Sequence, residues 1–200
     1  MDTRTNGHRD RSELPARALL TGTVACLASA AALALLARAE GKDALRPINA
    51  TSHWLHGEKA AECDKPDAMH TLIGFATHYA SAVFWALPFE YWRARRRPPS
   101  AGRLLRGACV TSAIAAAVDY GVTPKRFTPG WELVLGRRSM VAAYGALALG
   151  LAFGTKLAQG LVDRHRETPR QSPSREQDSS WAGPMASAPS HALRAPLRAS

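Results

Sequence analysis

Four long apolar blocks constrain this chain more than any other feature of its sequence. A helix needs about 20 mostly apolar residues to cross the hydrocarbon core of a bilayer, because only helices and closed barrels satisfy their own backbone hydrogen bonds in lipid. Residues 18–37 and 68–89 contain no Asp, Glu, Lys or Arg, and residues 104–124 and 139–162 contain few. The sequence therefore predicts an all-α fold, a four-helix transmembrane bundle.

The polar ends of the chain conceal this signal when mean hydropathy is taken over all 200 residues, where it is −0.19. Residues 1–17 are basic, and residues 163–200 are rich in Pro, Ser, Ala and Arg without a sustained apolar period. Such segments do not bury enough apolar surface to fold, so we expect both to be disordered. Arg106 and Lys156 lie near span ends, where long basic side chains reach the interface. The membrane domain is predicted to cover residues 18–162.

Lys and Arg beside the spans predict the orientation, because positively charged loops resist translocation. The more basic side would hold both chain ends and the loop between spans two and three, with Arg17, Arg93, Arg95, Arg96, Arg97, Arg103, Arg106, Lys156, Arg164 and Arg166. We expect that side to be the cytoplasm of a bacterial cell, with the protein in the inner membrane. The loop between spans three and four departs from the rule, because it carries Lys125, Arg126, Arg137 and Arg138.

The first span has an alternative interpretation as a secretory signal, since Ala37-Arg38-Ala39 is similar to a cleavage site. Cleavage there would leave three spans. The apolar stretch of residues 18–37 exceeds the usual length of about 7–15 residues for a signal core, and further spans follow it. These observations favour a retained helix.

The net charge of +10 raises the question of nucleic-acid binding, which needs a basic patch on a folded surface. Here the basic residues flank the spans, and one cluster follows span two directly: Arg93, Arg95, Arg96 and Arg97. Anionic headgroups attract each basic residue near the membrane surface by about 1 kcal/mol. The sequence predicts a lipid-facing basic anchor at this cluster and no nucleic-acid partner.

Three polar residues are predicted at membrane depth, where an ionisable side chain is costly unless it is paired or hydrated. They are His70 and His78 in span two and Asp119 in span three. His78 and Trp85 project about 20° apart on a helix, so they share a face that we expect to look into the bundle. His70 and Asp119 would lie at similar depth, and we expect them to pair. The three residues form either a polar relay or a set of hydrogen bonds between helices.

The outer loop is predicted to contain a short interfacial helix over residues 47–58 that ends at Gly57, with a polar cluster of Asn49, His53 and His56. Five loop residues have side chains that bind transition metals: His53, His56, Glu58, Glu62 and Cys63. Their spacing matches no known zinc pattern, so we predict no metal site. No other span supplies a histidine to face span two across a haem, so we predict no cofactor. Cys63 would face an oxidising compartment alone, which favours an intermolecular disulfide.

Small residues recur at four-residue spacing in several spans, as close packing of helix backbones in lipid requires. Gly150 and Gly154 form the clearest pair, and Gly22 begins a second row in span one. The pattern predicts close helix packing, and it leaves open whether the partner is another span or another subunit.

Residues 47–155 resemble small multi-spanning inner-membrane proteins of Gram-negative bacteria. The likeness depends on Pro47-Ile48-Asn49, Ser52-His53-Trp54-Leu55, His70-Thr71, His78, Phe84-Trp85-Ala86 and Asp119-Tyr120. That family has no assigned reaction, so the resemblance implies a topology and no catalytic residues. We expect a non-enzymatic structural, accessory or envelope-stress role, with the bilayer, its anionic headgroups, and a second copy or another membrane protein as partners. The alternative is a proton or ion transporter that uses His70, His78 and Asp119.

Overall fold

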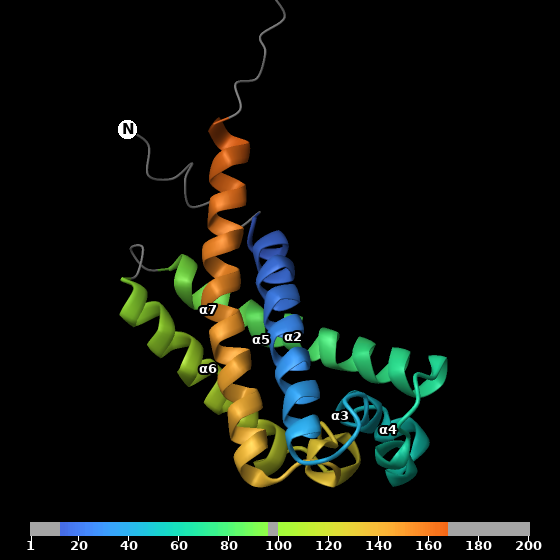
Figure 1. Cartoon of the computed structure of the whole chain (residues 1–200). Helices are drawn as coiled ribbons and strands as arrows, with labels where there is room; N and C mark the ends of the chain where they lie inside the picture. Colours follow the sequence, from blue (N-terminus) through green and yellow to red (C-terminus); the bar gives the residue numbers. More distant parts are fainter. Residues whose placement is uncertain (1–12, 96–99, 168–200) are drawn as a thin grey trace, which may run out of the picture. The chain divides into compact units, whose positions relative to one another are not determined.

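Four long helices dominate the fold (Figure 1): α2 (Leu14–Ala39), α5 (Ile73–Ala94), α6 (Ala101–Gly121) and α7 (Arg137–Glu167). The computed structural model describes residues 13–95 and 100–167. Each of the four helices is long and apolar enough to cross a membrane, α5 together with the preceding π-helical turn η2 (Ala68–Leu72). No strand occurs in the described ranges. The predicted all-α fold with four candidate transmembrane helices is confirmed.

The helix ends differ from the predicted span ends. α2 begins at Leu14, with Pro15 in its first turn, so residues 14–17 of the predicted disordered N-terminus are helical. α5 continues past Phe89 to Ala94, and α7 continues past residue 162 to Glu167. Hydropathy shows where the side chains along the sequence become polar. A helix can continue beyond that point, because it ends only where its backbone hydrogen bonds stop. The rest of the predicted disordered ends, residues 1–12 and 168–200, lies outside the described residues.

Glycines set the distance between the long helices. A Cβ atom added to Gly150 of α7 would lie 2.6 Å from the Ala25 Cα of α2, and one added to Gly154 would lie 2.9 Å from the Thr21 oxygen. A Cβ on Gly22 would lie 2.6 Å from the Val83 Cα of α5. The predicted close packing at these glycines therefore occurs between spans of one chain, with α2 held between α7 and α5.

The loop between α2 and α5 folds against the bundle. It contains α3 (Arg46–Ala50), α4 (His53–His56) and the 3-10 turn η1 (Glu58–Glu62). Gly57 ends α4 with a φ of 76°, as predicted, and its N–H donates to the His53 carbonyl. The predicted short helix of this loop is present as two segments, α3 and α4, and residues 47–53 are buried within the protein. A Cβ on Gly74 of α5 would lie 1.9 Å from the Ile48 oxygen, so this loop packs directly on α5.

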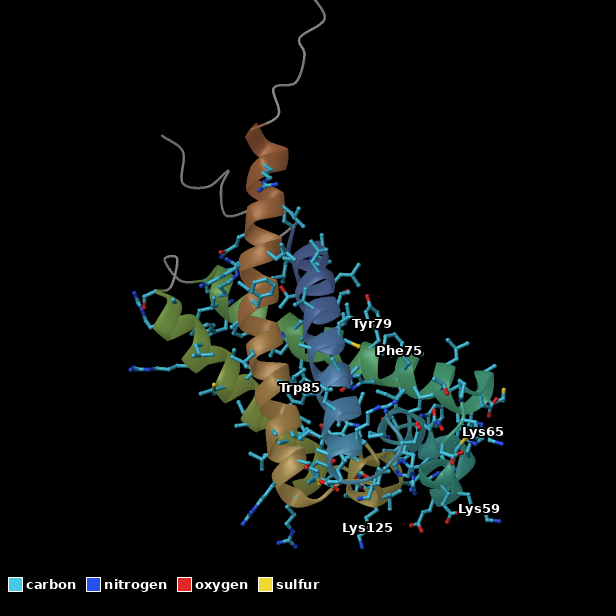
Figure 2. All side chains as sticks on the ribbon, viewed as in Figure 1. Lys59, Lys65, Phe75, Tyr79, Trp85 and Lys125 are labelled. Carbon is cyan, nitrogen blue, oxygen red and sulfur yellow. The ribbon has the colours of Figure 1, made fainter. Side chains whose placement is uncertain are left out.

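The loop between α6 and α7 covers the same end of the bundle. It contains the 3-10 turns η3 (Lys125–Phe127) and η4 (Trp131–Leu133). Figure 2 shows Lys59, Lys65 and Lys125 gathered at this loop end. Gly130 has a φ of 78° and lies so close to α3 that a Cβ there would be 2.4 Å from the Ala50 oxygen. Glu40, just after α2, accepts hydrogen bonds from the Gly136 N–H at 3.1 Å and the Ser139 hydroxyl at 2.5 Å.

Large apolar side chains cover the outside of the long helices. Val141 is 72% exposed and Leu35 is 69% exposed. Other large apolar side chains are exposed on every span: Leu27, Phe84, Val110, Ile114, Leu149 and Phe153. A water-soluble bundle would bury such residues, whereas lipid solvates them. Their exposure agrees with four helices that face a bilayer.

Candidate functional site

A cavity of about 380 Å³ lies between α5, α6, α7 and the two loops, and we call it the outer pocket after the orientation that the sequence predicts. Its walls come from segments far apart in the sequence: Thr51, Trp54, Thr77, His78, Ser81, Ala82, Trp85, Ala115, Asp119, Phe127, Thr128, Pro129, Trp131, Tyr144 and Leu147. Its volume falls within the range of about 300–1,000 Å³ that is usual for small-molecule sites. Two of the three polar residues predicted at membrane depth, His78 and Asp119, line it.

His78 lies on the inward face of α5, as its position beside Trp85 predicted, and is 5% exposed. Its Nε2 atom is 3.0 Å from the Ser29 hydroxyl oxygen of α2. The Ser29 hydroxyl also lies 2.8 Å from the Ala25 carbonyl oxygen of its own helix. Ser29 is fully buried, so it is not accessible to a substrate. This Ser–His contact therefore holds α2 to α5.

Asp119 pairs with Tyr144, whose hydroxyl donates to the carboxylate at 2.6 Å. The predicted pairing of Asp119 with His70 is wrong, because His70 Nδ1 instead contacts the carboxylate of Asp67. The depth argument placed both residues near the outer surface but left their rotation about the bundle unspecified. His70 belongs to the π-helical turn before α5 and is not among the residues that line the outer pocket.

Aromatic side chains form part of the remaining wall of the outer pocket. The Trp54 indole N–H donates to the Thr77 hydroxyl and that of Trp131 donates to the Thr51 hydroxyl, each at 3.2 Å. The Trp131 and Tyr144 ring centroids are 5.3 Å apart. The N–H groups of these two indoles are therefore satisfied within the protein, and their rings contribute apolar surface to the wall.

A second polar centre lies toward the other end of the bundle, around Glu90 of α5, and we call it the inner centre. Glu90 is fully buried and accepts hydrogen bonds from the Thr21 hydroxyl of α2 at 2.7 Å and from the Thr155 hydroxyl of α7. Arg93 Nε donates to the same carboxylate at 2.7 Å. The inner centre therefore ties three spans together through one carboxylate.

The inner centre was missed because the predicted span stopped at Phe89, which left Glu90 in a cytoplasmic loop. The spacing of Glu90 and Arg93, an i,i+3 pair on a continued helix, was the signal that could have revealed it. The expectation that Arg93 faces lipid is wrong, since Arg93 is 8% exposed and ion-paired. Arg95 is exposed and lies over the Tyr91 ring. The other two predicted anchor residues, Arg96 and Arg97, lie outside the described residues.

Apolar residues occupy the buried face of α5 between His78 and Glu90. Glu90 follows His78 by 12 residues on α5, which corresponds to about 18 Å along the helix axis. Ala82 and Ala86 lie between them on the buried face and are 3% and 0% exposed. A chain of hydrogen-bonding side chains from His78 to Glu90 is therefore interrupted along α5.

The predicted outer-loop cluster of Asn49, His53 and His56 divides into separate roles. Asn49 is fully buried, donates to the Cys63 carbonyl at 2.9 Å and accepts from the Thr71 hydroxyl at 2.7 Å. His53 is buried beside the Lys125 carbonyl, with Nε2 3.1 Å from that oxygen. His56 is half-buried with its ring centroid 4.5 Å from that of His70. Asn49 and His53 therefore join loop segments, and only His56 lies against another candidate site residue.

The comparisons with known proteins give no further identification. No family model matches the chain, and searches of curated proteins and of solved structures find no match. The resemblance to small inner-membrane proteins therefore stays a prediction, and the geometry of the two polar centres is what bears on function.

Proposed function

We propose that this protein is a non-enzymatic accessory protein of a bacterial inner membrane that binds a lipophilic organic cation in the outer pocket. The observation that carries the proposal is the Asp119 carboxylate in a pocket walled by Trp54, Trp85, Trp131 and Tyr144. Binding and sequestering such compounds is an envelope-stress role of the kind the sequence favours.

The chemistry of the pocket walls supports a cationic ligand. Aromatic faces attract cations through the quadrupole of the ring, with Trp the strongest, by about 2 kcal/mol or more when water is excluded. Asp119 adds a formal negative charge, and its hydrogen bond from Tyr144 fixes the carboxylate in place. Both features favour a cation over an anion of the same shape, and an apolar body on the ligand would contact the rest of the wall.

Tetraphenylphosphonium and tetraphenylborate provide a matched test, because they share shape and differ in the sign of the charge. With the protein in lipid nanodiscs, we expect tetraphenylphosphonium to quench tryptophan fluorescence saturably and tetraphenylborate to do so much more weakly. The Asp119→Asn variant should lose at least about tenfold in affinity for the cation, which corresponds to about 1.4 kcal/mol. The Asp64→Asn variant, changed at an exposed loop aspartate, should bind as the parent does.

Equal quenching by the two ions, or an unchanged affinity in Asp119→Asn, would overturn the proposal. A Trp85→Phe variant gives a second check. The phenylalanine ring still fills this part of the wall but attracts a cation more weakly than an indole does. We therefore expect a smaller loss of affinity for tetraphenylphosphonium than in Asp119→Asn.

The proposed orientation places both chain ends and the inner centre on the cytoplasmic side. Support comes from the distribution of Lys and Arg around the spans. In intact cells, a membrane-impermeant maleimide should label Cys63 in a variant that retains only this cysteine. A variant with Arg95→Cys as its only cysteine should react only after the cells are permeabilised. Labelling of both positions in intact cells would contradict the orientation.

Proton or ion transport is the second candidate, and the fully buried Glu90 is the observation that favours it. Buried acidic groups at membrane depth often mark ion pathways. The buried face of α5 carries alanines between His78 and Glu90, so the side chains of α5 provide no continuous hydrogen-bonded path between them, and we rank this candidate below ligand binding. A proton flux in reconstituted vesicles that is lost in Glu90→Gln would support transport, and no flux through the intact protein would remove it.

A further inference from the structure

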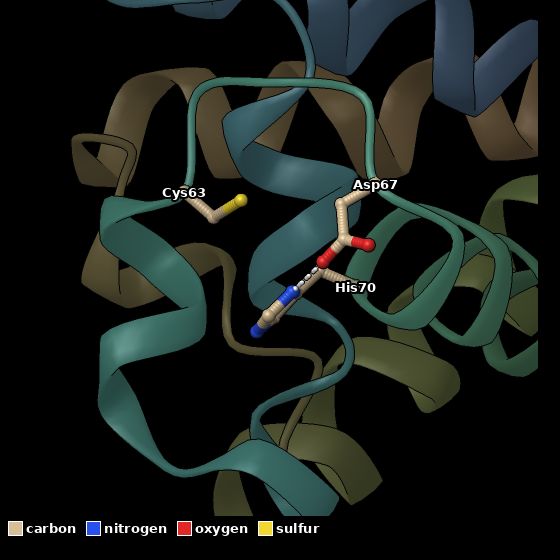
Figure 3. Close-up of side chains that lie close together, drawn as sticks. All are labelled: Cys63, Asp67 and His70. Atoms are coloured by element: carbon tan, nitrogen blue, oxygen red, sulfur yellow. Dashed lines mark hydrogen bonds and ion pairs between the residues drawn. The ribbon is translucent and has the colours of Figure 1, made fainter.

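We propose that Cys63, Asp67 and His70 bind a divalent zinc ion at the loop end of the bundle. We call these three residues the loop triad. One ligand atom from each, the Cys63 sulfur, an Asp67 carboxylate oxygen and a His70 ring nitrogen, lie within 4.8 Å of one another. Figure 3 shows the Cys63 thiol pointing across the loop toward Asp67, with His70 beside that carboxylate.

The chemical types in the loop triad select the metal. Thiolate, imidazole and carboxylate together suit zinc, whereas calcium and magnesium prefer oxygen ligands alone. A thiolate and a carboxylate also balance the charge of a divalent ion. Binding releases the thiol proton of Cys63 to solvent. The proton in the hydrogen bond between His70 Nδ1 and Asp67 moves to His70 Nε2, so that Nδ1 and the carboxylate each bond to the metal.

Zinc binding requires a small rearrangement of the loop triad: the Cys63 sulfur must move closer, and His70 Nδ1 and the Asp67 carboxylate, which are in contact without the metal, must move apart. Zinc lies about 2.3 Å from sulfur and about 2.0–2.2 Å from nitrogen or oxygen, so ligand atoms around it are about 3.5 Å apart. The side chains of His70 and Asp67 are 26% and 40% exposed. They are accessible to an ion from solution, and rotation of their side chains supplies the movement needed.

Buried hydrogen bonds hold the two sides of the loop in register. The Asn49 side chain donates to the carbonyl of Cys63 at 2.9 Å and to that of Lys65 at 3.3 Å. The Thr71 hydroxyl donates to Asn49 and accepts from the Asp67 N–H at 3.1 Å. Asn49 therefore fixes the backbone on both sides of the loop triad, as outer-shell groups do at metal sites. The His56 ring, tilted by 42° against that of His70, adds another imidazole beside the site.

The loop triad and the outer pocket have no residue in common, so this inference is independent of the proposed ligand binding. Sequence spacing did not reveal the triad, because the set of metal-binding residues considered for the loop ended at Cys63 and His70 was assigned to span two. The folded loop brings them to Cys63.

Cobalt substitution tests the site directly, because a cysteine thiolate bound to cobalt gives a charge-transfer absorption band. The reduced, full-length protein in detergent should develop this band on titration with Co²⁺, and added Zn²⁺ should abolish it. Cys63→Ser should remove the band. Asp67→Asn and His70→Ala should each weaken Zn²⁺ binding at least about tenfold, as changes at a metal site do.

The matched controls are Cys109→Ser, which changes an exposed cysteine elsewhere, and Asp64→Asn. Both should retain the cobalt band and the Zn²⁺ affinity of the parent. Helical circular dichroism shows that each variant is folded before it is titrated. A cobalt complex without a thiolate band, or an unchanged band in folded Cys63→Ser, would overturn the proposal.

Discussion

The Tyr144 hydroxyl of α7 donates a hydrogen bond to the Asp119 carboxylate of α6 across 2.6 Å, in the wall of the outer pocket. A second contact between the same helices is the hydrogen bond from the Ser112 hydroxyl to the Tyr144 carbonyl at 2.6 Å. Side-chain hydrogen bonds thus supply part of what holds α6 in place, since lipid provides no hydrophobic drive between helices.

Replacing Tyr144 with Phe should destabilise the protein by about 1 kcal/mol, because the Asp119 carboxylate loses its donor while ring packing is kept. Unfolding of the parent and of the variant in mixed detergent micelles measures the difference in their free energies of unfolding. Tyr91→Phe is the matched control, since Tyr91 is exposed at the end of α5, and it should have no effect. Strictly additive losses in Tyr144→Phe and Asp119→Asn would contradict the pairing.

Removal of the Glu90 carboxylate should be more severe. Glu90→Ala leaves Arg93 buried without its ion-pair partner and leaves the hydroxyls of Thr21 and Thr155 without their acceptor, so we expect a loss of about 3 kcal/mol. Arg93→Ala should cost a similar amount, and the double variant should lose less than the sum. Arg95→Ala, two residues on and exposed, serves as the control. Equal effects of Arg93→Ala and Arg95→Ala would argue against the inner centre.

Two glycines of α7 should respond to alanine with opposite signs. Gly150→Ala places a Cβ 2.6 Å from the Ala25 Cα, so α2 and α7 must separate, which typically costs about 1–3 kcal/mol. Nothing lies within 4 Å of a Cβ at Gly145, so Gly145→Ala should stabilise the helix by about 0.5–1 kcal/mol. Thermal unfolding of the two variants side by side provides the measurement. A stabilising Gly150→Ala would show that the helices are not in close contact.

The pH dependence of stability should show the contribution of the Glu40 carboxylate. Hydrogen bonds from the Ser139 and Lys42 side chains and from the Gly136 N–H lower the pKa of Glu40 from its ordinary value of 4.5 to about 2. In that interval the unfolded chain holds more protons than the folded one, so stability falls as pH decreases from 4.5 toward about 2. Because the carboxylate lies near the surface, solvent screening reduces the effect.

Glu40→Gln provides the comparison for this pH effect. Melting temperatures of the parent and of the variant across the acidic range should converge as the Glu40 carboxylate becomes protonated. The difference between them should be largest above pH 4.5, where the carboxylate is charged in both states. A constant difference across that range would contradict the assigned role of Glu40.

The sequence predicted four apolar helices because a membrane-spanning segment is a local property, which the hydropathy of about 20 consecutive residues reveals. The inward position of His78 beside Trp85 followed from helical periodicity, and the end of α4 at Gly57 followed from the preference for glycine at helix C-termini. In each case the evidence lies within one element, so no knowledge of the other elements was needed.

Contacts between elements depended on the tertiary structure. The similar predicted depth of Asp119 and His70 in the membrane suggested that they pair. In the structure, the rotation of α6 and α7 about their axes places Asp119 beside Tyr144 instead. The sequence suggested that Glu90 and Arg93 are surface residues. In the structure α5 continues through both of them, and the hydroxyls of Thr21 and Thr155 donate to the Glu90 carboxylate. Periodicity fixes which face a residue occupies on its own helix, whereas side-chain packing among all the helices decides which faces meet.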